Sequence, residues 1–278
     1  MKKYSFKNIL GVALAGLALS SCQKDFDPKS YAPPLNIGGF TSAAQVAPSN
    51  LVAHWAFDGN LADSVSKTAG TATGTSFTGG IKGQGLQGAL NSYVITAPSA
   101  TITGLTSFTM TEWVNTPPPS TGIIGLFSLA KTNAFWGNFE IFIENGSTND
   151  NGKLRVHFFN GTDDVTYALD NVKNMFDKWV NLGVSYNEST SVVTVYLNGS
   201  EVGNTKLNGL SGALKFQNTG NIVFGCVQFQ TDPSQTTATG KQSWASYLTG
   251  QLDEVRIYNK ALSDNEINAV VKLEGRGK

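Results

Sequence analysis

Leu51-Val52-Ala53-His54-Trp55-Ala56-Phe57 is a stretch whose side chains alternate with a period of two residues. The alternation places Trp55 and Phe57 on one face together with two smaller apolar residues, because successive side chains of a strand point to opposite faces. The segment 108–114 alternates in the same way. A period of two predicts β-strands rather than helices in this chain.

Further strands are expected along the rest of the chain, separated by turn signals. They are expected at 92–97, 122–130, 138–145, 153–160, 164–169, 178–186, 191–198, 220–227 and 249–258. Asn198-Gly199 is a strong hairpin signal, since both residues tolerate the positive φ angles of a type I′ turn. Many short strands with regular turns predict an all-β sandwich or barrel.

One helix is expected near the C-terminus. Ser263-Asp264-Asn265-Glu266 has the spacing of a capping box, in which the serine hydroxyl accepts from the backbone N–H of Glu266 and Glu266 reaches back. The helix that it opens is short and ends near Leu273.

The first residues are typical of a secretory signal peptide. Three lysines precede an apolar run of 11 residues at 9–19, which is shorter than the roughly 20 residues that cross a bilayer. The run ends in Leu19-Ser20-Ser21-Cys22, which resembles a bacterial lipobox. That resemblance implies that residues 1–21 are removed and that Cys22 carries the lipid. The alternative is an ordinary signal peptide with an incidental cysteine.

The mature chain is expected to consist of a tether and one domain. Residues 22–50 comprise the lipidated Cys22 and a flexible tether, in which Pro33-Pro34 and Pro48 prevent regular structure, and residues 51–278 form the folded domain. The acidic segment just after Cys22 resembles the export signal of some surface lipoproteins of Gram-negative bacteria. The expected location is the outer membrane, facing the cell exterior, with membrane contact through the lipid anchor only.

Charge and cysteine content exclude several function classes. Without the three signal lysines, 17 basic residues remain of 20 and face 20 acidic ones, a net charge of −3. A net negative charge is not typical of a protein that binds nucleic acid or anionic lipid. With Cys22 lipidated, Cys226 is the only other cysteine, so no intrachain disulfide forms, and we expect Cys226 to be a buried, inert thiol.

Two segments carry a resemblance to a known family. They are 51–64 and 250–267, and between them the segments 83–86, 108–114, 178–180 and 195–199 follow in the expected order. The set is similar to the laminin-G-like, concanavalin A-like lectin/glucanase domains. The resemblance implies a two-sheet antiparallel jelly roll over about 51–272, with the first and last strands side by side. Trp55, Trp113 and Trp179 are then expected in the core, and Glu112 departs from the family, where a small or apolar residue is commoner.

Three aspartates are candidate ligands for a structural calcium ion. Asp58 follows the first strand, Asp63 lies in the loop after it, and Asp253 lies at the start of the last strand. Calcium prefers carboxylate and carbonyl oxygens, and jelly-roll domains of the resembled family often hold calcium near this edge. The alternative is that these carboxylates only cap turns.

Aromatic residues in polar surroundings are candidates for carbohydrate binding. Phe135, Trp136 and Asn138 form one group, and Trp244 and Tyr247 form another. Sugar rings stack on aromatic faces, while their hydroxyls need amide and hydroxyl partners. The alternative is that these rings only fasten loops to the sandwich, which would favour a surface scaffold. If a ligand binds without these rings, a sheet face around Arg155 and His157 is the next candidate.

No catalytic set is evident. Glucanases with this fold use two glutamates and an aspartate on one strand, whereas this chain has Phe142 between Glu140 and Glu144. The two glutamates lie ~13 Å apart along an extended strand and are interpreted as a solvated face. The expected function is therefore a non-catalytic glycan-binding module. The alternatives are an adhesion or structural protein that binds protein ligands, and a divergent glycoside hydrolase.

Overall fold

The computed structural model describes residues 35–278, and it assigns residues 36–278 to one compact unit. The signal segment and Cys22 lie outside the described residues. Within the described range, no helix is long and apolar enough to span a membrane.

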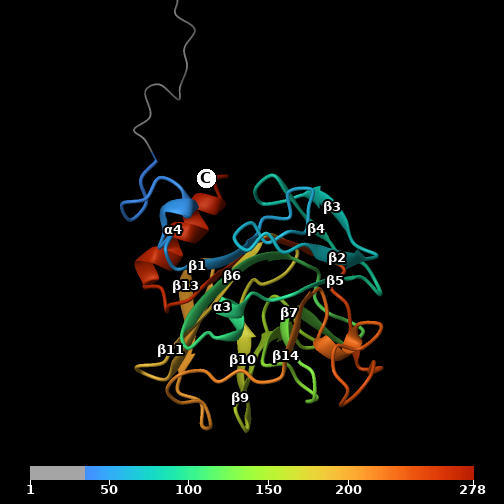
Figure 1. Ribbon diagram of the computed structural model, residues 1–278. Coiled ribbons are helices and arrows are strands. Elements are labelled where there is room, and N and C mark those ends of the chain that lie inside the picture. Colours follow the sequence, from blue (N-terminus) through green and yellow to red (C-terminus); the bar gives the residue numbers. More distant parts are fainter. Residues whose placement is uncertain (1–34) are drawn as a thin grey trace, which may run out of the picture. The chain divides into compact units, whose positions relative to one another are not determined.

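Two β-sheets form the body of the unit, with eight strands each among residues 35–278 (Figure 1). The first, here called the β6 sheet, runs in the order β13 (Ser200–Thr205), β12 (Val192–Leu197), β11 (Val180–Asn187), β6 (Phe108–Asn115), β16 (Gln251–Tyr258), β4 (Gln84–Gln87) and β3 (Ser76–Gly79), and β1 (Leu51–Trp55) also pairs with β16.

The second, here called the β8 sheet, runs in the order β10 (Asp163–Val172), β9 (Gly152–Asn160), β8 (Phe139–Ile143), β7 (Ile123–Lys131), β14 (Thr219–Phe224), β5 (Tyr93–Thr96) and β2 (Gly70–Thr73). The short β15 (Ala245–Ser246) adds to β7 in parallel, and the other pairings of both sheets are antiparallel. The expected all-β, two-sheet antiparallel sandwich is confirmed.

The core lies between the sheets and is rich in aromatic rings. Trp55 of the β6 sheet and Phe224 of the β8 sheet meet edge to face with ring centroids 5.1 Å apart. Phe108 and Phe139 make a similar contact at 4.8 Å. Such pairs add to the free energy gained from burying large apolar side chains. These contacts hold the two sheets face to face.

The ends of the domain are joined as the sequence predicts. His54 of β1 lies opposite Arg256 of β16, and Leu51 lies opposite Tyr258. After β16, α4 (Asp264–Glu274) begins with the predicted capping box between Ser263 and Glu266. The turn residues Asn198 and Gly199 both have positive φ, as a type I′ hairpin requires.

The two outer sheet faces differ. Helix α4 buries Ile267, Val270 and Leu273, and its residue Glu274 bonds Trp113 and Arg256 on the outer face of the β6 sheet. The other helices among residues 35–278 are single turns: η1 (Ala43–Gln45), α3 (Ala100–Thr103) and η2 (Gln228–Gln230). Over the β8 sheet, loops cover part of the outer face and leave a groove.

Some sequence predictions are corrected. The domain begins before residue 51, because η1 contacts α4 and Ala43 and Val46 are buried; the tether predicted to reach residue 50 is therefore too long at its end. Trp113 lies against α4 on the outer face rather than between the sheets, and Trp179 is only half-buried. Cys226 is fully buried as predicted, and burial raises the pKa of its thiol.

Candidate functional site

A groove of about 380 Å³ lies on the outer face of the β8 sheet. Trp136 and Trp244 come from two loops, and Ile123 comes from the start of β7. Strands β8, β9 and β10 contribute Phe142, Arg155, Thr166 and Ala168, and Glu144 directly follows β8. The groove therefore combines aromatic walls with a floor of mixed polar and apolar side chains, and both kinds of group can contact a sugar ring.

Strand register builds the floor of the groove. Phe142 of β8 lies opposite Arg155 of β9, and Arg155 lies opposite Ala168 of β10. Two residues away on each strand, Glu140 lies opposite His157, and His157 lies opposite Thr166. Because side chains two residues apart share a face, these rows form one continuous outward surface.

Trp136 lies flat over this surface. Its ring stacks on Phe142 with centroids 5.0 Å apart and an interplanar angle of 4°. It also lies 5.6 Å from the ring of His157. Trp136 is half-buried, so one part of the ring packs on the sheet and another part faces the groove.

The loop that carries Trp136 is anchored by Glu140. Its carboxylate accepts hydrogen bonds from the hydroxyl of Ser128 at 2.5 Å, the backbone N–H of Gly137 at 2.9 Å and that of Gln228 at 3.2 Å. Glu140 is fully buried, so its interpretation as part of a solvated face is wrong. Burial raises the pKa of Glu140 to about 7 against the opposing effect of these donors.

Trp244 forms the other wall and is the more exposed ring, at 43% of its possible surface. It stacks against Phe135 with centroids 6.1 Å apart and an interplanar angle of 17°. The side-chain amide of Gln228 donates to the carbonyls of Ala134 and Phe135 and so fixes this loop. Phe135 therefore supports Trp244 from behind.

Arg155 is the charged centre of the floor. Its Nε donates to Glu144 at 2.7 Å, and one terminal nitrogen donates to Asp170 at 3.0 Å. The other terminal nitrogen donates to the carbonyls of Leu154 and Leu169. The neighbouring His157 is neutral, because burial lowers its pKa to about 3, and it contacts the Thr166 hydroxyl at 3.0 Å.

The structure brings together three of the five predicted carbohydrate-binding residues: Phe135, Trp136 and Trp244. Asn138 is fully buried and exchanges hydrogen bonds with the backbone of Gln217 and Ala130 instead. Tyr247 packs in a different cluster with Tyr93, Val223 and Cys226, and its hydroxyl donates to the carbonyl of Gln230. Neither side chain reaches the groove.

Sequence reasoning missed part of the floor. Phe142, Thr166 and Ala168 had no site role assigned, although Phe142 lies between Glu140 and Glu144 on the same face. The period of two identifies that face. It does not say which strands lie beside β8, and so it cannot assemble the groove.

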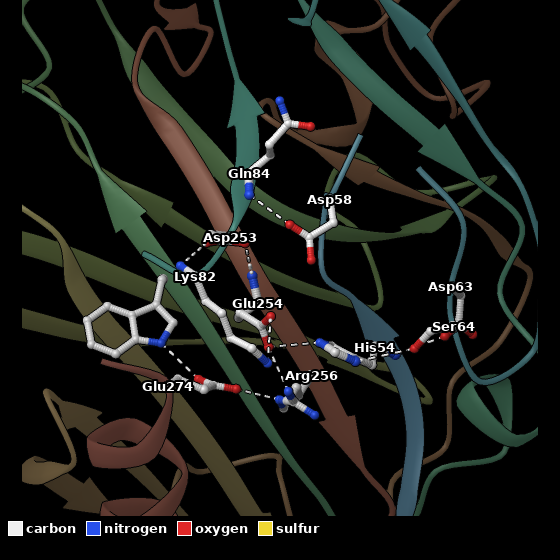
Figure 2. Close-up of polar contacts among 11 residues, drawn as sticks. His54, Asp58, Asp63, Ser64, Lys82, Gln84, Asp253, Glu254, Arg256 and Glu274 are labelled. Atoms are coloured by element: carbon white, nitrogen blue, oxygen red, sulfur yellow. Dashed lines mark hydrogen bonds and ion pairs between the residues drawn. The ribbon is translucent and has the colours of Figure 1, made fainter. Parts of the chain in front are cut away.

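A second polar cluster lies on the outer face of the β6 sheet, beneath α4 (Figure 2). Arg256 lies between two buried glutamates, donating to Glu254 at 2.6 Å and also to Glu274. Trp113 donates to the other oxygen of Glu274 at 2.8 Å. Burial opposes ionisation of Glu254, but the hydrogen bond from His54 and the charge of Arg256 outweigh it and lower the pKa to about 2.

His54 extends this cluster to Ser64. The His54 ring contacts Glu254 at 3.0 Å through Nε2 and the Ser64 hydroxyl at 3.2 Å through Nδ1. A serine, a histidine and a carboxylate in line could suggest a nucleophile. However, the N–H groups of Val65 and Ser66 donate to the Asp63 carboxylate, and that of Ser64 donates to the His54 carbonyl. These three donors are not available for an oxyanion.

The predicted calcium ligands are only partly brought together. Asp58 and Asp253 both accept backbone hydrogen bonds from the turn at 80–84, from Gln84 and Lys82 respectively. A Cβ at Gly83 would overlap an oxygen of Asp58, and one at Gly80 would overlap an oxygen of Asp253, so glycine lets both carboxylates approach the turn. Burial raises the pKa of Asp253 to about 7 against these donors.

Asp63 does not belong to that group. Both of its oxygens accept hydrogen bonds, from His54, Val65 and Ser66, and it lies beside Ser64 and away from Asp253 (Figure 2). Among residues 35–278, no group of three or more His, Cys, Asp or Glu side chains gathers in a way that could hold a metal ion. Asp58 and Asp253 fit calcium only with backbone or solvent oxygens as further ligands.

Two toxin binding domains are among the solved structures with a similar fold. The binding domain of Paraclostridial Mosquitocidal Protein 1 matches with a TM-score of 0.59 and 16% identity, over 80% of this chain and 52% of that one. The binding domain of botulinum neurotoxin DC in complex with rat synaptotagmin II matches with a TM-score of 0.58 and 17% identity, over 83% and 52%. This chain thus spans about half of each toxin domain.

A third structure matches over almost its whole length. Domain 4 of a GH43 extracellular arabinanase from Geobacillus stearothermophilus, in complex with arabinotriose, has a TM-score of 0.54 and 22% identity, over 80% of this chain and 98% of that one. At these identities the likeness establishes the fold alone. No curated protein sequence gives a significant match.

The sequence itself matches a family model over residues 86–268, from β4 to the first turns of α4. That range contains the whole groove, and of the cluster around Arg256 it contains Trp113, Glu254 and Arg256. The protein therefore belongs to the laminin G family of the concanavalin A-like lectin/glucanases superfamily.

Proposed function

We propose that this domain is a non-catalytic carbohydrate-binding module and that the glycan lies in the groove between Trp136 and Trp244. The observation that carries the proposal is the pairing of an exposed aromatic wall with Glu144, Arg155 and Thr166 on the outer face of the β8 sheet. The likeness to an arabinanase domain in complex with arabinotriose supports it. Recognition of a protein ligand is the second candidate, supported by the toxin domain in complex with synaptotagmin II.

Replacing Trp136 or Trp244 with alanine is expected to weaken glycan binding about ten-fold or more while the fold is kept. Stacking of a base on an aromatic ring contributes about 1–3 kcal/mol, and we take the same scale for a sugar ring. Titration calorimetry with neutral and acidic polysaccharides measures the effect. The same mixtures are expected to release no reducing sugar.

Trp55→Ala is the matched control, because Trp55 is buried between the sheets and faces no groove. It is expected to cost about 3–5 kcal/mol of stability, as large core truncations do. Unfolding of both Trp136→Ala and Trp244→Ala would show that the rings only fasten loops. Unchanged binding by both folded variants would place the glycan elsewhere.

The absence of catalysis is part of the proposal and has a structural basis. Glu140 is buried under three hydrogen-bond donors, and Phe142 stands where glucanases of this fold have an aspartate. The Glu144 carboxylate accepts a hydrogen bond from Arg155. These contacts argue against two carboxyl groups on this face that act as the acid and the nucleophile of a glycosidase.

We also propose a structural calcium ion held by Asp58 and Asp253 against the turn at 80–84. Chelation is expected to lower the melting temperature, and Asp253→Asn should remove most of that sensitivity. An ion present at 100 times its Kd stabilises the folded state by about 2.7 kcal/mol. Asp63→Asn is the control and should keep the sensitivity to chelator. A melting curve indifferent to chelator and to added calcium would exclude the ion.

Cys22 is proposed to anchor the protein in the outer membrane, so that the domain faces the cell exterior. Without the signal lysines the chain has 17 basic and 20 acidic residues, a net charge of −3. We therefore do not expect a basic patch to assist membrane contact. Cys22→Ser is expected to abolish labelling by a palmitate analogue, because only the thiol sulfur forms the thioether. Equal labelling of both forms would contradict the anchor.

A further inference from the structure

Exposed charges around the groove are mostly negative. Glu144 is 39% exposed, Asp164 52% and Asp170 55%. Asp164 and Asp170 lie on β10 with Thr166 and Ala168 between them on the same outward face. Carboxylate oxygens therefore border the floor on which Arg155 lies.

Arg155 offers little positive charge to a ligand in the groove. The Arg155 side chain is 11% exposed, and four of its five N–H groups already donate, two to carboxylates and two to backbone carbonyls. Lys153 lies on the outward face of β9 and, like Asp164 and Asp170, stands beside the groove without lining it, so one basic side chain faces three carboxylates there. His157 is a buried ring whose Nε2 lies 3.3 Å from an oxygen of Asp164, and burial lowers its pKa to about 3.

From these contacts we infer that the groove selects uncharged polysaccharides and rejects uronates and sulfated glycans. The inference rests on the proposed glycan-binding function and adds the ligand class. Hydroxyl groups of a neutral sugar can donate to Glu144 and Asp170, and hydrogen bonds to a charged acceptor are about twice as strong as neutral ones. A carboxylate or sulfate on the ligand would instead meet like charges and find one N–H of Arg155 at most.

Affinity gels test the ligand class. The protein is run at 150 mM salt through gels that contain neutral arabinan, galactan, xylan or β-glucan, and through gels that contain polygalacturonate, alginate or a sulfated galactan. Retention by at least one neutral polymer is expected, with at least ten-fold weaker retention by every anionic one. Trp136→Ala and Trp244→Ala should each remove retention, which ties it to the groove.

The double variant Glu144→Gln with Asp170→Asn tests the stated cause. It leaves the charge of Arg155 without a carboxylate partner, so retention by polygalacturonate or alginate should rise at least ten-fold. The control is Asp177→Asn with Glu188→Gln, which changes the net charge equally in the turns at the two ends of β11. The control should retain anionic polymers no better than the unmodified protein.

The outcomes separate the inference from the function on which it rests. Retention by anionic polymers as strong as by neutral ones, lost in Trp136→Ala, would overturn the charge selection and leave glycan binding in place. No retention by any polymer would overturn both. A double variant that still rejects anionic polymers would overturn the role of Glu144 and Asp170.

Discussion

Replacing Arg256 with methionine is expected to lower the free energy of unfolding by about 3–5 kcal/mol. The arginine is 2% exposed and lies between Glu254 and Glu274, which are themselves buried. Its removal leaves Glu274 without a cation and leaves Glu254 with only His54 and the partly exposed Lys82, in an environment that solvates charge poorly. Urea unfolding followed by tryptophan fluorescence measures the loss.

Two further variants identify the cause of that loss. Lys260→Met breaks the more exposed pair with Glu266 and should cost less than about 1 kcal/mol. Combining Arg256→Met with Glu254→Gln and Glu274→Gln removes the unpaired charges and should restore at least half of the lost stability. If the triple variant is as unstable as the single one, lost packing rather than buried charge is responsible.

Replacing Glu112 with methionine is expected to stabilise the domain, and more so as the pH rises. Glu112 lies on the core-facing side of β6 with Met110 and Val114, opposite Leu182 of β11. It is fully buried, and neither carboxyl oxygen has a hydrogen-bond partner among the described residues. Burial raises the pKa of Glu112 from 4.5 to about 8.

The stability gained by Glu112→Met is expected to grow with pH because the folded and unfolded chains release the Glu112 proton at different pH. Below pH 4.5 both the folded and unfolded chains keep the proton, so ionisation of Glu112 adds no pH dependence. Between pH 4.5 and about pH 8, Glu112 loses its proton in the unfolded chain but keeps it in the folded chain. The free energy of unfolding therefore falls as the pH rises through this range. At about 1.4 kcal/mol for each pKa unit, the cost reaches roughly 4 kcal/mol near pH 8.

Unfolding curves of both proteins at pH 5 and pH 8 test this prediction. The stability gain of Glu112→Met should be several-fold larger at pH 8. Comparing the two proteins at each pH removes the contributions of Glu140 and Asp253, whose raised pKa values act in the same direction in both. A gain that does not depend on pH would mean that Glu112 is ionised in the folded protein or paired in a way not described here.

The sequence by itself determined the class of fold, most strand positions and the closure of the domain. The period of two around Trp55 identifies the buried face, and Ser263 and Glu266 mark the helix start, because both signals depend on residues within one turn or strand. Strands β2, β3 and β13 were missed, as were the short β4 and β15. The first three are largely exposed, and their Gly-, Ser- and Thr-rich sequences lack apolar alternation.

Tertiary structure decided which of the candidate residues meet. Trp244 and Tyr247 are three residues apart, yet one borders the groove and the other packs beside Cys226. Asp58 reaches the same turn as Asp253, whereas Asp63, five residues on, caps its own loop. The floor of the groove joins Phe142, Arg155 and Ala168 through the registers of three strands. Local sequence sets the face of each side chain, but its neighbours depend on strand pairings between distant residues, which no local pattern specifies.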